Sequence, residues 1–112
     1  MNDVFYLKRG DTLPPMRATL LEADGVTPVD LAGATVVLQL RDRRGTHLFD
    51  ADCTVLDAEA GRVEYEWVEG DTDTVGAHRA EFEITSSDGI ATAPNYGFVT
   101  VHISEDIREE VS

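Results

Sequence analysis

The 112-residue chain has little that would tie it to a disulfide, a nucleic acid or a membrane. Its single cysteine, Cys53, excludes an internal disulfide and a zinc site built from cysteines. Lys8 is the only lysine, and all basic residues together number 9 against 22 acidic ones, which gives a net charge of −13. Because phosphate groups and anionic lipids are bound by clustered basic side chains, we expect neither nucleic acid nor a membrane as a partner. No apolar run reaches the ~18 residues of a membrane-spanning helix, and no signal peptide is expected.

The excess of acidic residues leaves two interpretations open. A chain of this charge stays soluble in concentrated salt and repels itself when salt is low, which favours a halophilic, haloarchaeal setting. The alternative is an acidic protein of a mesophilic host with a GC-rich genome. A melting temperature that does not rise between low and molar salt would exclude the halophilic interpretation.

What the sequence does contain is the periodicity of β-strands. Residues 62–67 and 80–85 alternate polar and apolar side chains, which predicts strands with one buried and one solvent-facing side. The side chains predicted to share one interior are Val63, Tyr65, Trp67, Ala80, Phe82 and Ile84. The glutamates between them, Glu64, Glu66, Glu81 and Glu83, are predicted to face solvent.

Further strands are predicted where shorter apolar runs occur. They cover residues 4–8, 16–20, 35–41 and 98–103, and residues 47–56 hold one strand or two short ones. The turns between strands are predicted at Gly25, Gly45, Gly61, Gly76 and Gly89, where glycine allows a positive φ angle. About seven short strands with turns every ~8–12 residues indicate an all-β, Ig-like antiparallel sandwich. We expect one domain over residues 1–112, with a short N-terminal arm at 1–3 and a C-terminal tail at 104–112.

Catalytic and metal-binding chemistry finds little support in the residue pattern. His78 and His102 have opposite strand parity, so they should lie on different faces and not converge with His47. Asp71 and Asp73 lie in a predicted turn and are the better calcium candidates, although no EF-hand pattern surrounds them. Cys53 has acidic neighbours that raise the pKa of a thiol, so it is predicted to be a buried filler. We expect no enzyme and no cofactor, with calcium as the one open possibility.

Three aromatic residues are less easily placed in the interior than the others. Tyr6, Tyr96 and Phe98 are therefore the candidates for contact with a protein partner. A second hypothesis uses the same region differently. The loop of residues 94–98 and the turn at Asp71 and Asp73 would then form a receptor- or carbohydrate-binding site, assisted by calcium.

The order of these segments resembles a known family. The segment 5–12, the two prolines at 14–15, the segment 18–20, the turn at 24–25, the segment 28–36 and the strand end at Arg41 are similar to small Ig-like virion domains of tailed phages. The similarity continues through residues 61–67, 76–84, 88–89 and 94–95, and covers roughly residues 4–103. These domains are grouped with the N-terminal domain of the phage upper baseplate protein family. This chain departs from the family at His78, where a tyrosine is usual.

The resemblance implies a structural protein of a tailed virus, and the family brings no catalytic residues with it. The location it implies is the virion, in the baseplate or tail, the neck or the capsid surface. The expected partners are other virion proteins, including further copies of this chain within a symmetric assembly.

Overall fold

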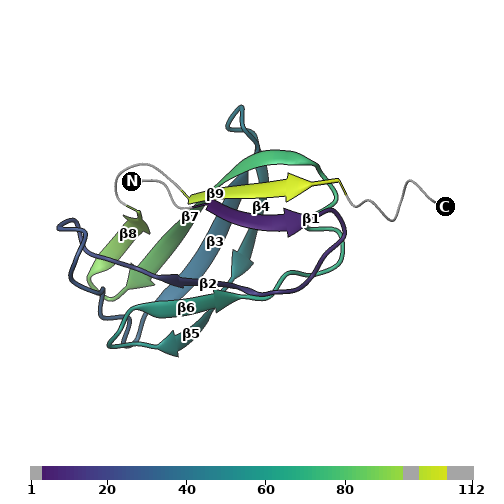
Figure 1. Ribbon diagram of the computed structural model, residues 1–112. Helices are drawn as coiled ribbons and strands as arrows, with labels where there is room; N and C mark the ends of the chain where they lie inside the picture. Colours follow the sequence, from purple (N-terminus) through teal and green to yellow (C-terminus); the bar gives the residue numbers. More distant parts are fainter. Residues whose placement is uncertain (1–3, 95–98, 106–112) are drawn as a thin grey trace.

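Nine β-strands in two sheets make up the regular structure of the chain (Figure 1). The computed structural model describes residues 4–94 and 99–105. The strands are β1 (Val4–Lys8), β2 (Met16–Thr19), β3 (Thr35–Arg41), β4 (His47–Asp52), β5 (Thr54–Asp57), β6 (Arg62–Tyr65), β7 (Gly76–Ser86), β8 (Gly89–Ala93) and β9 (Val99–Ser104). Among the described residues, no helix has the length and apolar character required to span a bilayer.

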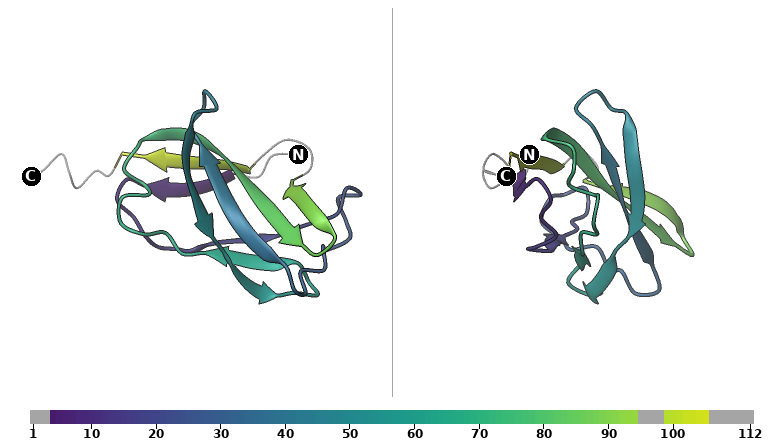
Figure 2. Two further views of the ribbon diagram at one scale, coloured as in Figure 1. Left: turned by 180° about the vertical axis from the view of Figure 1, so that it is seen from behind. Right: turned by 90° about the vertical axis from the view of Figure 1, so that its right-hand side faces the viewer.

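The two sheets have unequal sizes and face each other across the core (Figures 1 and 2). The larger sheet has the order β1-β9-β7-β3-β4, with β8 also paired to β7, and the smaller sheet has the order β2-β6-β5. The sequence prediction of an all-β sandwich is therefore confirmed. The number of strands is nine, where about seven were expected, because residues 47–57 split into two strands and β8 was not predicted as a strand.

One pair of strands departs from the predicted antiparallel pattern. β1 runs parallel to β9, with Val4 opposite Thr100 and Lys8 opposite Ser104. The sandwich is therefore antiparallel, as expected, except at this edge. Ser104 also belongs to β9 through its pairing with Lys8, and only residues 106–112 of the expected C-terminal tail lie outside the described residues.

On one side β7 pairs with β3 from Arg79 to Thr85, and on the other side it pairs first with β9, from Gly76 to Ala80, and then with β8, from Phe82 to Ser86. Phe82 of β7 pairs with Ala93 of β8, and Ala80 of β7 pairs with Val99 of β9. One residue of β7 lies between these two positions, whereas five residues separate Ala93 from Val99, so the returning chain has four extra residues at this point. β8 and β9 are thus two parts of one returning strand, interrupted where the chain leaves β8 at Pro94.

The chain passes from the larger sheet to the smaller one at Cys53. β4 ends at Asp52 beside β3, and β5 begins at Thr54 beside β6. The Cys53 N–H donates to the carbonyl oxygen of Val36 at 2.9 Å, which fixes the crossing point to β3. This crossing closes one side of the sandwich with covalent chain.

The interior is formed by the side chains that the alternation assigned to it. Val63, Tyr65, Trp67, Phe82 and Ile84 belong to one buried cluster, as predicted. Trp67 lies beyond the end of β6 but is still buried, and its ring packs edge-on against Tyr65 at a centroid distance of 5.0 Å. The turn glycines predicted to have positive φ all have it, which is confirmed at Gly25, Gly45, Gly61, Gly76 and Gly89.

Candidate functional site

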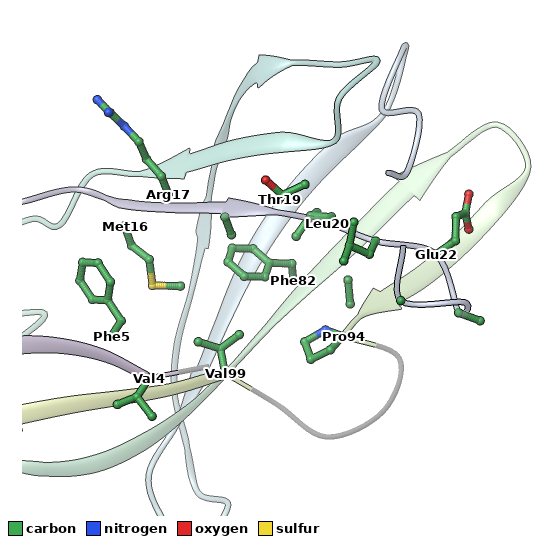
Figure 3. Close-up of a pocket in the computed structure, with 15 residues that line it drawn as sticks. Val4, Phe5, Met16, Arg17, Thr19, Leu20, Glu22, Phe82, Pro94 and Val99 are labelled. Atoms are coloured by element: carbon green, nitrogen blue, oxygen red, sulfur yellow. The ribbon is translucent and has the colours of Figure 1, made fainter. Parts of the chain in front are cut away.

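The side of the sandwich opposite the Cys53 crossing is open and contains an apolar groove (Figure 3). Its volume is about 600 Å³. One wall is formed by β2 and the segment that follows it, and the opposite wall by the starts of β1 and β9 together with the end of β8. The side chains that project into it are mainly apolar, and include Phe5, Met16, Leu20, Phe82 and Val99.

Within the part of the chain that the structure describes, the groove exists because both sheets end there without pairing to each other. β1 is the last strand of the larger sheet and β2 is the last strand of the smaller one. At its far end β2 is held by Leu20, whose N–H donates to Gly61 at 2.7 Å and whose carbonyl accepts from Val29 at 2.9 Å. Gly61 has a φ of 67°, and a Cβ at this position would lie 2.6 Å from the Leu20 carbonyl oxygen. This close approach of two backbones requires glycine.

Tyr6, the first predicted contact residue, is exposed on β1 close to this open side. Its exposed fraction is 69%, and its ring lies edge-on to the ring of His102 at a centroid distance of 5.8 Å. The neighbouring Val4 is also 46% exposed, so β1 presents two large side chains to solvent. Tyr96 and Phe98, the other two predicted contact residues, lie outside the described residues.

The two calcium candidates have different surroundings. The Oδ2 atom of Asp71 accepts hydrogen bonds from the Tyr65 hydroxyl and from the Val68 N–H, the second at 2.9 Å. Asp73 is exposed in the same turn. Within residues 4–94 and 99–105, no cluster of three or more His, Cys, Asp or Glu side chains is arranged to hold a metal ion. The arrangement shows that Asp71 ties the turn to β6, and calcium binding stays a prediction for a titration to test.

The bond to Asp71 also changes the acidity of Tyr65. Burial raises the pKa of the Tyr65 hydroxyl above its usual value, and the hydrogen bond to Asp71 and the carboxylate charge raise this pKa further. The phenol therefore remains a donor at neutral pH. Thr72 extends the connection, since its Oγ1 accepts from Gly10 N at 3.1 Å and donates to the Asp11 carbonyl at 2.9 Å.

The three histidines do not converge, as their strand parity predicted. His78 is buried, and its Nδ1 lies 3.1 Å from the Gly76 carbonyl oxygen and 3.3 Å from that of Val101. His102 is opposite Ala77 in the ladder and so points to the other face of the sheet. His47 Nε2 is 2.8 Å from Asp50 Oδ1 at the surface.

Cys53 is partly buried at the crossing between the sheets. Burial raises the pKa of its thiol to about 11, and the negative charge of Asp52 adds to this increase. The acidic neighbours were expected to raise this pKa, whereas desolvation is the larger cause. A thiol with this pKa is protonated at neutral pH and is a poor nucleophile.

The outer face of the larger sheet carries an acidic patch, defined here as Asp50, Asp52, Glu81 and Glu83. β4 and β7 flank β3, so that Gln39 lies between Asp50 and Glu81, and Val37 lies between Asp52 and Glu83. The outward direction predicted for Glu81 and Glu83 is confirmed by this register. The patch concentrates part of the net charge of −13 on one face.

The groove itself was not predicted from the sequence. Phe82, at its base, was assigned correctly to the inward side of its strand. Alternation does not indicate, however, whether an inward side chain meets the other sheet or an opening. The feature that could have indicated an opening is the pair of prolines at 14–15, because proline favours the entry to an edge strand.

Taken together, these features define a small β-sandwich whose open strand edges suit contact with other proteins. The model of one family, described as the BppU N-terminal domain, matches residues 17–108. The chain belongs to this family, whose name refers to the upper protein of the phage baseplate. It is therefore a structural protein of the phage baseplate type and a component of the virion.

The chain was also compared with curated proteins and with solved structures. No curated protein matches the sequence. Among solved structures, the crystal structure of CopC from Methylosinus trichosporium OB3b is similar, with a TM-score of 0.48 and 15% sequence identity. The similar region covers 93% of this chain and 86% of that one.

Proposed function

We propose that the chain is a structural module that binds other virion proteins in the baseplate region of a tailed virus, and that it occurs in several copies within a symmetric assembly. The observation that carries this proposal is the match to the BppU N-terminal domain over residues 17–108. The structure supports it with strand edges at β1 and β2 that no other described strand pairs with, and with the exposed side chains of Val4 and Tyr6 on β1.

The charge distribution favours protein partners over nucleic acid or an anionic membrane. The acidic patch on the larger sheet and the net charge of −13 repel phosphate groups. The same charge supports a virus of a halophilic, haloarchaeal host, in which concentrated salt screens the repulsion between copies. The melting temperature should then rise from low to molar salt, and a flat or falling dependence would exclude the halophilic host.

The test of the proposed function is reconstitution. The full chain is co-expressed with the other tail proteins encoded by the same virus, and complexes are analysed by native mass spectrometry at matched ionic strength. We expect a complex of fixed stoichiometry that contains this chain. A chain that stays alone with every tail protein, and that is missing from purified particles, would contradict the proposal.

A further inference from the structure

The wall of the groove formed by β2 exposes backbone as well as side chains. All four residues of β2, Met16–Thr19, line the groove, which indicates that the edge of this strand, and not one of its faces alone, borders the opening. β2 pairs with β6 on one side, and among the described residues no strand pairs with its other side. The groove therefore has one wall made from the free edge of a strand.

The register shows which backbone groups face that edge. In an antiparallel pair, residues alternate between those whose N–H and C=O groups bond to the partner and those whose groups point away. The Leu20 N–H donates to Gly61, so Ala18 and Met16, two and four residues earlier, also direct their backbone toward β6. Arg17 and Thr19 direct their N–H and C=O groups toward the free edge.

The side chains of the same pairs agree with this assignment. Arg17 lies opposite Glu64 in the ladder, and its Nε is 2.7 Å from Glu64 Oε2. Positions that are opposite but not joined by backbone bonds bring their side chains closest, as this ion pair requires. Two donor and acceptor positions, 17 and 19, are thus available to an added strand.

The floor of the groove can receive the side chains of such a strand. Phe82 lies at its base, Met16 and Ala18 of β2 and the following Leu20 line one wall, and Phe5 and Val99 line it from the larger sheet. Side chains on an extended peptide point alternately to opposite faces. A peptide paired with β2 would therefore place every second side chain against this apolar floor and the others toward solvent.

The charged side chains at the rim of the groove favour one kind of added segment. Arg17, the one basic residue among the described residues that line the groove, is already paired with Glu64, whereas Glu22 at the rim is exposed. Asp24, in the adjoining turn, adds a second exposed carboxylate. At low ionic strength, where this charge is not screened, a second copy of this chain, with its own charge of −13, would be repelled at this rim. A basic segment would be attracted.

We propose that this groove binds an extended segment of another virion protein, which adds to the free edge of β2 as a further strand. The segment has apolar side chains at alternate positions and lysine or arginine at the positions between them. This proposal rests on the proposed function for the identity of the partner, but the pairing with β2 is tested separately.

The first experiment uses a synthetic peptide, Thr-Val-Lys-Val-Thr-Val-Lys-Val-Thr, added to the full chain. Its affinity is measured by fluorescence anisotropy, and amide exchange is followed by NMR. We expect binding that slows exchange of the Arg17 and Thr19 amides and leaves those of Ala18 and Leu20 unchanged, since the latter are already bonded or directed to β6. A peptide with glutamate in place of lysine, or with N-methyl groups on alternate amides, should bind more weakly.

Three variants separate pairing with the backbone from other modes of binding. Thr19→Pro removes the N–H at the free edge while the bond from Leu20 to Gly61 remains, and it should weaken peptide binding about fivefold or more. Thr19→Val keeps the N–H and is the matched control, with affinity unchanged within about twofold. Ala18→Leu fills part of the groove and should also weaken binding, which provides a test should Thr19→Pro fail to fold.

The outcomes distinguish this proposal from the proposed function. Loss of peptide binding in Thr19→Pro and Ala18→Leu, with both variants folded, supports strand addition. No binding of the peptide, or unchanged exchange at Arg17 and Thr19, would overturn it. A dimer of this chain that disappears in Thr19→Pro would also overturn it, because a second copy would then be the occupant. Virion complexes that form equally with wild type and Ala18→Leu would exclude the groove while the proposed function stands.

Discussion

The two sides of the sandwich are built from the same alternating strands, yet one is closed and the other is open. At the closed side, β4 leads directly into β5 through Cys53, whose N–H is bonded to Val36. At the open side, β1 and β2 are separated by the groove. The difference shows that burial of one strand face does not close a sandwich. Closure requires a chain crossing or a partner strand at that edge.

The largest change in stability is expected from truncating a buried leucine, and it should differ between the closed and the open side. Leu38 is fully buried between Ala51 of β4 and Phe82 of β7, whereas Leu20 lines the groove. Leu38→Ala should lower the free energy of unfolding by about 4–5 kcal/mol, because it leaves a sealed cavity, and Leu20→Ala by about 2–3 kcal/mol. Urea unfolding measures both. An equal or larger loss for Leu20→Ala would mean that the groove is not open in solution.

The next prediction concerns the point where β2 is anchored. Gly61→Ala places a Cβ against the carbonyl oxygens of Leu20 and Val29 at a positive φ, and should cost about 3 kcal/mol or more. Gly25→Ala is the matched control, since it has a φ of 73° and open space around the added atom. Its cost should be only the conformational strain of about 1–2 kcal/mol. Similar losses of stability in the two variants would contradict the tight contact between Gly61 and β2.

A smaller effect is expected at Tyr65, which lies on β6 between the two edge strands of its sheet. Tyr65→Phe removes the hydrogen bond to Asp71 and should lower stability by about 1.5–3 kcal/mol. The folded-state pKa of Tyr65 is raised, so its contribution is fully present below the unfolded value of about 10 and is lost as pH rises above it.

Thermal melts between pH 8 and pH 11 test this dependence. Wild type should lose more stability than Tyr65→Phe above about pH 10. Parallel curves for the two proteins would show that the Tyr65 hydroxyl does not couple to folding.

The last prediction concerns the reactivity of Cys53, at the closed side of the sandwich. Because burial raises the pKa of Cys53 to about 11, iodoacetamide at pH 8 should react about 100-fold more slowly than with a free thiol of pKa about 8.5. The rate should increase about tenfold per pH unit up to pH 10 and reach that of a free thiol in concentrated urea. Rapid alkylation of the folded protein at pH 8 would show that the crossing opens.

Sequence reasoning succeeded where the signal was local. The alternation at residues 62–67 assigned Val63, Tyr65 and Trp67 to the interior, and all three are buried. It missed β8 because only Ala93 of that strand is buried, and Ile90 is 69% exposed. A strand held by backbone bonds to β7 and facing solvent on both sides carries no alternation of hydrophobicity.

The candidate site was less accessible to the same reasoning. Tyr6 was identified correctly as an aromatic residue outside the core. The groove could not be predicted, because its position depends on β1 and β2 being the last strands of their sheets on the same side of the sandwich. Asp71 was noted as a possible calcium ligand from its place in a turn. Its bond to the Tyr65 hydroxyl depends on how that turn folds back onto β6, which spacing alone does not specify.

The sequence by itself determined that the chain is all-β, which side chains face inward, and where glycine turns the backbone, because these properties depend on residues close together in the chain. Only the tertiary structure decided that β1 pairs in parallel with β9, that Cys53 carries the chain between sheets, and that β2 keeps a free edge. Those features depend on which strands become neighbours, and backbone hydrogen bonds between strands are the same for every sequence.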